Sequence, residues 1–241
     1  MAVFAVVNRK GGVGKSTVAT HVAAYLASKG LEVMLGDVDR QQSSRLWLSL
    51  RPESRPHIHG WTIDDRNFAR PPAGVKHVVL DTPGGFQGIG LMKVAQYADA
   101  IIVPATTSVF DRAAAADSIK ELRSFPRIAT GKCTLACLGM RIDGRTRNGE
   151  ALQRWAAGLE LNYLGSIKAA QAYSRCLEQG LALFDYPHEK VADYLREWTA
   201  LVALLDATLA REAEPAPAAR TVETDERIRP VVASVPDYLR R

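Results

Sequence analysis

The segment KGGVGKST, residues 10–17, constrains the fold of this chain more than any other part of the sequence. It stands between a short apolar run, Ala2–Val7, and a helical pattern that begins at Lys15. Its three glycines allow successive backbone amides to face one point, and the amino end of the following helix adds partial positive charge there. A strand, a glycine-rich loop and a helix in this order are typical of a phosphate-binding loop. We therefore predict a nucleotide site rather than a glycine-rich turn with a purely structural role.

Chemical roles can be assigned to individual residues of this loop. The Lys15 ammonium is expected to contact the β and γ phosphates of a nucleotide. The Ser16 hydroxyl is expected to ligate Mg²⁺. The loop residues predicted to bind the nucleotide are Gly11, Gly12, Val13, Gly14, Lys15, Ser16 and Thr17.

Short β-branched or apolar runs alternate with longer helical patterns along the chain, which indicates βαβ units and a parallel sheet. The sequence therefore predicts an α/β P-loop NTPase fold, with a mostly parallel central sheet flanked by helices on both faces. Strands are expected at Ala2–Val7, Glu32–Leu35, Val75–Leu80, Ala100–Val103 and Cys133–Met140. Helices are expected at Lys15–Lys29, Asp111–Ser124, Gly149–Gly158, Ala169–Gly180 and Glu189–Ala210.

A chain of 241 residues has room for one well-buried domain with short extensions. Residues 1–210 are predicted to form this domain, with residues 51–74, rich in Pro, Arg and His, as a variable connection inside it. Residues 211–241 are predicted to form a flexible polar tail. This tail holds six Arg and six Asp or Glu, so the whole formal charge of +5 belongs to residues 1–210.

Several classes of protein are disfavoured by the residue types present. The three cysteines, Cys133, Cys137 and Cys176, contain no CxxC pair and are expected to be buried free thiols. His57 and His59 alternate like one face of a strand, but no nearby cysteine or acidic pair completes a metal site. No apolar run reaches the ~20 residues that cross a bilayer, and the amino terminus lacks the charge order of a signal peptide. A cytoplasmic location is expected.

A carboxylate is expected beside the phosphate-binding loop. Asp81 follows an apolar run in the segment VVLDTPGG, at the carboxyl end of a predicted strand. There it can hold Mg²⁺ through water, while Gly84 and Gly85 allow the backbone to move when the γ phosphate is lost. An aspartate after an apolar strand is common in α/β proteins, so its significance comes from its combination with the phosphate-binding loop.

These motifs resemble those of the ParA and MinD family of deviant Walker A ATPases. The deviant loop has an additional lysine at the position of Lys10, whereas Arg9 stands where the general GxxxxGK[ST] pattern has its first glycine. The segment GDVDRQQSS is similar to the Asp-x-Asp switch of the family, although Arg40 replaces the usual proline. The segments ADAIIVPATTS, MRIDGRTR and AYSRCLEQGLALFDYP extend the resemblance over residues 1–210.

The resemblance implies ATP with Mg²⁺ as the nucleotide and assigns further residues. Lys10 is implied to reach across a dimer to the partner's ATP, so it is added to the nucleotide-binding set. Asp39 is implied to position the attacking water, and Asp37 to support the magnesium shell. The implied catalytic residues are therefore Lys10, Lys15 and Asp39. The implied metal-site residues are Ser16, Asp37, Asp39 and Asp81.

The function implied by the resemblance is that of a partition-type ATPase. Such a protein forms a sandwich homodimer with ATP, binds DNA without sequence preference and segregates or positions a cargo. A ParB-like or other adaptor stimulates hydrolysis that is slow without it. The candidates for DNA binding, with nucleoid association, are Lys168, Arg175 and Lys190, because the excess positive charge belongs to residues 1–210. The resemblance places Lys168 near a basic region that partition ATPases use for DNA. The stretch Met140–Asp143 and residues near Pro187 are implied to border the adenine.

Alternative functions within the superfamily remain open. A MinD-like membrane-associated ATPase would need an amphipathic carboxyl-terminal helix, which Pro230 and Pro236 interrupt, so a membrane partner is not expected. A P-loop biosynthetic ligase or synthetase would activate a carboxylate without the dimer-bridging Lys10. An iron-sulfur relative would need cysteines between residues 82 and 99, where this chain has none. The cargo, whether plasmid, chromosome region or protein compartment, is not encoded in any motif that we identify.

Overall fold

The computed structural model describes residues 1–39, 41–62, 76–143, 145 and 147–213. Within them, seven strands form one sheet in the order β3-β2-β4-β1-β5-β6-β7, and each neighbouring pair is parallel. The strands are β1 (Ala2–Val6), β2 (Val33–Asp37), β3 (His59–Thr62), β4 (His77–Asp81), β5 (Ala100–Ala105), β6 (Thr134–Ile142) and β7 (Asn162–Lys168). The predicted fold class is confirmed.

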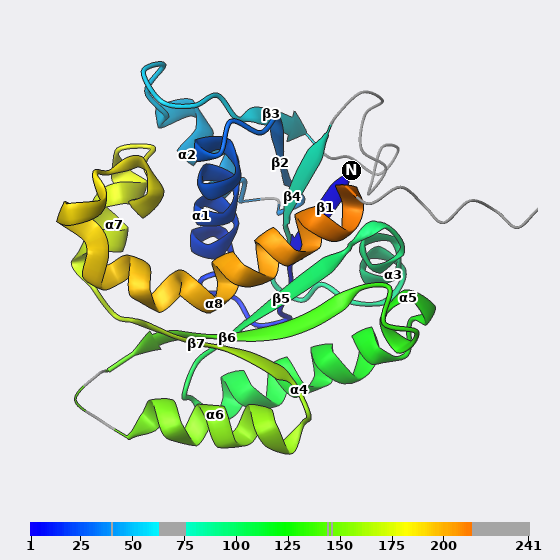
Figure 1. The fold of residues 1–241 in the computed structure, drawn as a ribbon. Helices are drawn as coiled ribbons and strands as arrows, with labels where there is room; N and C mark the ends of the chain where they lie inside the picture. The colour runs from blue at the N-terminus through cyan, green and yellow to red at the C-terminus, as the bar shows by residue number, and fades with distance from the viewer. Residues whose placement is uncertain (40, 63–75, 144, 146, 214–241) are drawn as a thin grey trace, which may run out of the picture.

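Helices cover both faces of this sheet (Figure 1). One layer contains α1 (Lys15–Ser28), α2 (Ser43–Leu50), α7 (Gln171–Glu178), the 3₁₀ turn η1 (Leu183–Asp185) and α8 (His188–Ala213). The opposite layer contains α3 (Gly88–Tyr97), α4 (Val109–Arg123), α5 (Pro126–Ala129) and α6 (Asn148–Gly158).

The central strand β1 shows why the sheet is enclosed on both sides. All five of its residues are buried, with side chains that alternate between the two layers because successive residues of a strand face opposite sides. Phe4 and Val6 join the core beneath α1 and α8, whereas Val3 and Ala5 join the core beneath α3 and α4. The phosphate-binding loop therefore emerges from a fully buried central strand, which gives it a rigid base.

Some elements differ from those expected from the sequence. The connection predicted for residues 51–74 contains strand β3, which pairs with β2 at the sheet edge. The sequence patterns also failed to predict α2, α3, α5 and β7, whereas the predicted strands and helices are present with ends shifted by a few residues. Helix α8 continues to Ala213, and residues 214–241 of the predicted tail lie outside the described residues.

A buried ion pair holds the carboxyl end of α2 against the segment before α8. Arg51 donates from Nη1 and Nη2 to the two carboxylate oxygens of Asp185 at 2.9 and 2.8 Å. Trp47 Nε1 donates to the carbonyl oxygen of Leu181 at 3.1 Å. The backbone of Gly180 approaches Leu50 so closely that an added Cβ would lie 2.3 Å from the Leu50 carbonyl carbon. These contacts fix α2, which begins beside the predicted phosphate site.

The predictions about thiols and histidines can be compared with the structure directly. The three cysteines are free and buried, as predicted, and burial raises the pKa of Cys133 and of Cys137 to about 12. The rings of His57 and His59 lie 4.5 Å apart. Among the described residues, no group of three His, Cys, Asp or Glu side chains could hold a metal ion. No described helix combines the length and apolar character that a bilayer crossing requires.

Candidate nucleotide site

The loop between β1 and α1 has the backbone conformation that its glycines predict. Gly12 and Gly14 have φ values of 76° and 98°, in the left-handed region that other residues avoid. At Gly14 a Cβ would also lie 2.9 Å from Cε of Met140. Neither a side-chain cap nor an acidic first-turn residue covers the amino end of α1. Its free N–H groups and its dipole therefore favour an anion at this point.

Lys15 is buried at the start of α1 and its side chain turns back over the loop. Its Nζ donates to the carbonyl oxygen of Lys10 at 2.9 Å. Burial lowers the pKa of Lys15, and the nearby carboxylates of Asp81 and Asp39 act in the opposite direction. An ammonium held beside the open amino end of a helix is placed to neutralise phosphate charge.

Asp81 lies at the carboxyl end of β4, next to the phosphate-binding loop, and is almost completely buried. Its Oδ2 accepts a hydrogen bond from Ser44 Oγ at 2.7 Å, whereas its Oδ1 has no partner among the described residues. Burial raises the pKa of Asp81 to about 6, against the lowering effect of hydrogen bonds from Ser44 and Ser16. A buried carboxylate oxygen without a donor, close to the Ser16 hydroxyl, fits a hydrated Mg²⁺.

Asp37, which the resemblance placed in the magnesium shell, accepts three backbone hydrogen bonds at the end of β2. Its Oδ1 accepts from the Asp39 amide at 2.9 Å, and its Oδ2 accepts from the amides of Ser44 and Arg45 at 2.9 and 3.1 Å. Burial raises the pKa of Asp37, and these three hydrogen bonds act against the rise. Oδ2 therefore holds the first turn of α2, and Oδ1 holds the loop that precedes this helix. Through this turn Asp37 positions Ser44, the residue that donates to Asp81.

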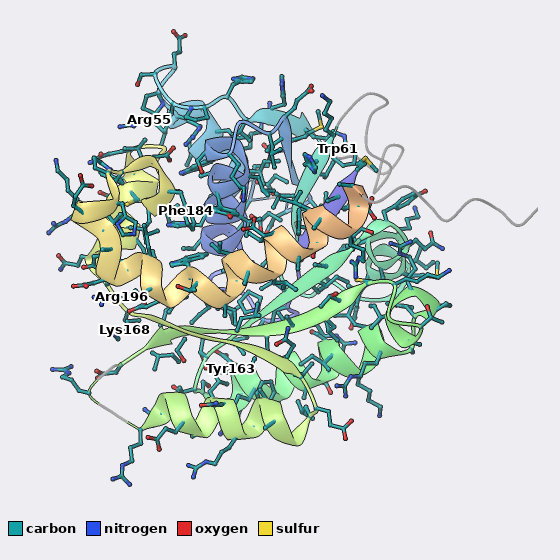
Figure 2. The ribbon with its side chains drawn as sticks, viewed as in Figure 1. Arg55, Trp61, Tyr163, Lys168, Phe184 and Arg196 are labelled. Atoms are coloured by element: carbon teal, nitrogen blue, oxygen red, sulfur yellow. The ribbon has the colours of Figure 1, made fainter. Side chains whose placement is uncertain are left out.

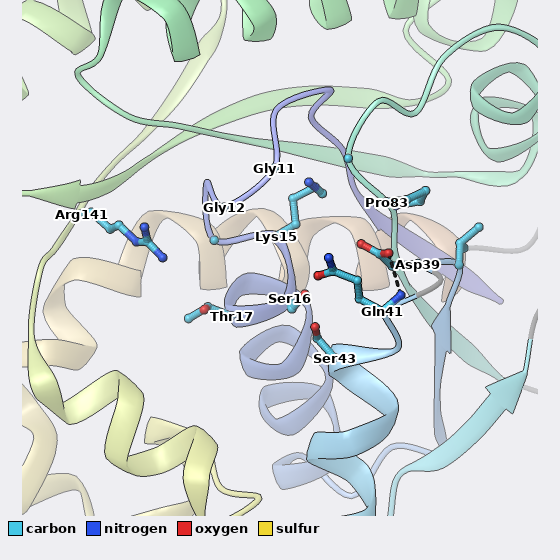
Figure 3. A pocket seen from close by; sticks show the side chains of 13 residues that line it. Gly11, Gly12, Lys15, Ser16, Thr17, Asp39, Gln41, Ser43, Pro83 and Arg141 are labelled. Atoms are coloured by element: carbon cyan, nitrogen blue, oxygen red, sulfur yellow. Dashed lines mark hydrogen bonds between the residues drawn. The ribbon is translucent and has the colours of Figure 1, made fainter.

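Asp39 faces the phosphate-binding loop across a cavity of about 710 Å³ (Figure 3). Its Oδ1 accepts from the Gln41 amide at 3.0 Å. The cavity is lined by Gly11, Gly12, Gly14, Lys15, Ser16, Thr17, Val38, Asp39, Gln41, Ser43, Pro83, Gly84 and Arg141. The structure therefore brings together most of the predicted phosphate and metal residues, while Arg40 lies outside the described residues.

A second cavity of about 510 Å³ adjoins the first and is lined by residues of β6, β7 and α7. Gly14, Thr17 and Arg141 line both cavities. Met140, from the stretch expected to border adenine, lines the second cavity, whereas Pro187 is not among its lining residues. The two cavities together give room for a phosphate chain at the loop and a nucleoside beside β6 and α7.

Neither Arg9 nor Lys10 is among the residues that line the phosphate cavity. Arg9 forms an ion pair with Glu121 of α4, and the other carboxylate oxygen of Glu121 accepts from the Gly88 amide at 2.7 Å. The Lys10 side chain is exposed, and its described hydrogen bonds are made by its backbone, including the donation from its amide to Asn8 Oδ1 at 2.8 Å. The arginine that departs from the general motif therefore ties the loop to α4 and to the start of α3.

The sequence patterns did not identify every residue at the site. Gln41, Ser43 and Ser44 lie in the quoted segment GDVDRQQSS, where two serines after the second aspartate were the available signal for a helix start. Arg141 lies in the stretch Met140–Asp143 that the resemblance placed at the adenine, but the resemblance gave it no role of its own. Its place beside the loop depends on an irregularity in the pairing of β6 with β7, and the sequence patterns did not predict this irregularity.

The three candidates for DNA binding are exposed, but they differ in their contacts. Lys168, at the end of β7, lies 3.2 Å from a carboxylate oxygen of Glu197 in α8 (Figure 2). Arg175 in α7 donates to Gln171 Oε1 at 3.2 Å, and Lys190 stands in the first turn of α8. The charge of Lys168 is thus partly balanced within the chain, whereas the contacts described for the other two involve no carboxylate.

The chain is similar to known proteins in sequence and in fold. Residues 4–184 match the family described as "CobQ/CobB/MinD/ParA nucleotide binding domain". Over 210 residues the chain is 29% identical to maintenance of carboxysome distribution protein A of Gloeobacter kilaueensis, covering 80% of this chain and 91% of the relative. The structure of apo McdA from Cyanothece superposes with a TM-score of 0.67 at 17% identity, covering 85% of this chain and 99% of that one. The structure of an ATP complex of a Cyanothece McdA variant superposes with a TM-score of 0.64 at 16% identity, covering 87% of this chain and 96% of that one.

Proposed function

The chain belongs to the CobQ/CobB/MinD/ParA family of nucleotide-binding domains, and from this premise we propose that it is a ParA-type positioning ATPase. In this proposal two copies form a sandwich dimer with ATP, and the dimer binds DNA without sequence preference. A ParB-like or other adaptor stimulates hydrolysis, which releases the dimer. The similarity to a protein named for the maintenance of carboxysome distribution supports a role in positioning a large cargo.

The proposed chemistry assigns a separate task to each residue around the cavity. The amides of the phosphate-binding loop and Lys15 bind and neutralise the phosphates within one subunit. Ser16 and Asp81 would hold Mg²⁺, which supplies positive charge to the phosphates when it is bound. Asp39 orients the attacking water from the opposite side of the cavity. Asp37 keeps this loop and the Ser44 hydroxyl in place through its three backbone hydrogen bonds.

The observation that carries the proposal is that the two loop lysines differ in burial and in contact with the cavity. Lys15 is buried in the cavity of its own subunit, whereas Lys10 is exposed and is not among the residues that line it. An exposed lysine outside the lining of its own cavity is available to neutralise phosphate charge on a second subunit, which is the task of a trans-acting cation in a dimer. Two triphosphates that face each other concentrate negative charge. Where this charge is desolvated, it needs a cation such as the Lys10 ammonium of the other subunit.

The test compares Lys10→Ala with Lys15→Ala. Because Lys10 makes its described hydrogen bonds through its backbone, Lys10→Ala should fold normally and keep the monomer's affinity for labelled ATP. Its MgATP-dependent dimerisation, measured by light scattering during size exclusion, should fail, and hydrolysis should fall with it. Lys15→Ala serves as the contrasting variant, since it should weaken nucleotide binding itself. A Lys10→Ala protein that dimerises and hydrolyses ATP like the wild type would show that the sandwich mechanism is wrong for this chain.

A further inference from the structure

Arg141 stands at the carboxyl end of β6 in a backbone conformation that is unusual for an arginine. Its φ is 55°, in the left-handed region where a Cβ is unfavourable and glycine is the common residue. The side chain is exposed and makes no hydrogen bond or ion pair with any residue in the described part of the chain. Neither packing nor charge pairing within these residues therefore accounts for an arginine at this strained position.

A local irregularity of the sheet produces this conformation. Gly139 and Ile142 of β6 lie opposite Ser166 and Lys168 of β7, so the stretch on β6 contains one residue more than the stretch on β7. Such a bulge bends the strand and redirects a side chain, and bulges are common beside active sites. Here the redirected side chain is that of Arg141, which Figure 3 shows extending from β6 toward Gly12 and Thr17.

Arg141 lies where the phosphate chain of a bound nucleotide is expected to meet the nucleoside. Gly14, Thr17 and Arg141 are the residues that line both the phosphate cavity and the adjoining cavity. Lys15 and Asp39 lie in the first cavity only, where the terminal phosphates are expected. The junction of the two cavities is where the phosphate chain meets the nucleoside. A guanidinium there presents paired N–H donors that match the oxygens of a phosphate group.

We propose that Arg141 binds the α-phosphate of a nucleotide held in its own subunit, and that the β6 bulge exists to aim its guanidinium there. This rests on the proposed nucleotide site but not on dimer formation. The α-phosphate is common to ADP and ATP, so Arg141 contributes equally to the affinity for both. In this respect it differs from Lys10 and Asp39, whose proposed tasks depend on the γ phosphate.

The strained backbone makes Arg141→Gly an informative variant, because glycine adopts a positive φ without penalty and should not harm folding. Without nucleotide, its melting temperature is expected to equal or exceed that of the wild type. The affinity for MgADP and for a slowly hydrolysed ATP analogue, measured by titration calorimetry, is expected to fall about tenfold for each. Arg141→Lys keeps the charge but loses the paired donors, so an intermediate loss is expected.

Glu160→Gly provides a matched control. Glu160 also has a positive φ, 51°, but it lies two residues after the end of helix α6 and lines neither nucleotide cavity. It should gain stability as Arg141→Gly does, with unchanged affinity for both nucleotides. Wild-type affinity in Arg141→Gly, or a loss confined to the ATP analogue, would overturn the α-phosphate assignment alone. A wild-type protein that binds neither nucleotide would overturn this assignment together with the proposed function.

Discussion

At the scale of single residues, Asp37 and Asp39 illustrate how two carboxylates of one motif differ in task. Asp37 is buried and accepts three backbone hydrogen bonds, whereas Asp39 is partly exposed, faces the phosphate-binding loop and accepts one. The spacing of the motif places both near the loop. Only the direction of each side chain separates a structural acceptor from a residue that is free to meet a water molecule.

Asp39→Ala is therefore expected to keep ATP binding and the ATP dimer while losing turnover. The substitution removes one hydrogen bond, which the Gln41 amide donates to Asp39. The free energy of unfolding should therefore change by no more than about 0.5 kcal/mol. Asp37→Ala should instead destabilise the protein by about 1–2 kcal/mol, because the first turn of α2 loses its acceptors. Phosphate release and urea unfolding measure the two effects. An Asp39→Ala variant that stays monomeric with MgATP, under conditions where the wild type dimerises, would contradict the assignment.

At the scale of secondary structure elements, the sequence predicted those whose stability is local and missed those that depend on neighbours. Lys15–Ser28 and Ala100–Ala105 are long or apolar enough to be recognised alone. Strand β3 has only four residues, including a histidine and a glycine, and it exists because β2 offers a partner at the sheet edge. Strand β7 likewise has polar residues and Gly165 with φ 90°, and its irregular pairing with β6 sets the position of Arg141.

The packing of α1 against α8 provides a pH-dependent contact between elements. His21 of α1 is fully buried and stacks on Trp198 of α8, with ring centroids 4.8 Å apart. Its Nδ1 lies 2.8 Å from the carbonyl oxygen of Thr17, and its Nε2 has no partner among the described residues. Burial lowers the pKa of His21 from 6.5 to about 4, although the Thr17 carbonyl and the charge of Asp185 favour the protonated form. The folded protein therefore keeps this imidazole neutral.

Stability should decrease on acidification through His21. Above pH 6.5 the ring is neutral in both states, and between pH 6.5 and 4 the unfolded chain takes up a proton that the folded chain excludes. Between pH 7.5 and 5 this residue should reduce the free energy of unfolding by about 2 kcal/mol. Urea unfolding of the wild type and of His21→Phe at both pH values isolates the effect, since the other titrating groups are shared. Equal pH dependence in the two proteins would show that His21 is not held neutral.

At the scale of the whole molecule, charge distribution decides whether the proposed dimer can bind DNA. The formal charge of +5 belongs to residues 1–210, because positive and negative residues balance in 211–241. Arg175 and Lys190 lie in the layer of α1, α7 and α8, opposite the layer that contains α4. If the proposed dimer binds DNA through this layer, its basic side chains would contact phosphates without any need for base contacts.

The corresponding prediction is salt-sensitive DNA binding that requires MgATP. The logarithm of the binding constant should fall linearly with the logarithm of salt concentration, with a slope of about 0.9 for each phosphate neutralised. Arg175→Ala and Lys190→Ala should each lower this slope by about 1, and should weaken binding equally on unrelated sequences. Lys168→Ala should have a smaller effect, because Glu197 already lies 3.2 Å from its ammonium.

Lys120→Ala is the control for this experiment, since Lys120 is exposed on α4 in the opposite layer. Its salt dependence should equal that of the wild type in fluorescence anisotropy with labelled duplexes. If the wild type binds DNA equally with ADP and ATP, or does not bind at low salt, nucleotide-dependent DNA binding is excluded. If Lys120→Ala reduces the slope as much as Arg175→Ala and Lys190→Ala do, the contact surface is not the layer of α7 and α8. The DNA-binding surface of the proposed dimer would then have to include basic residues of a different face.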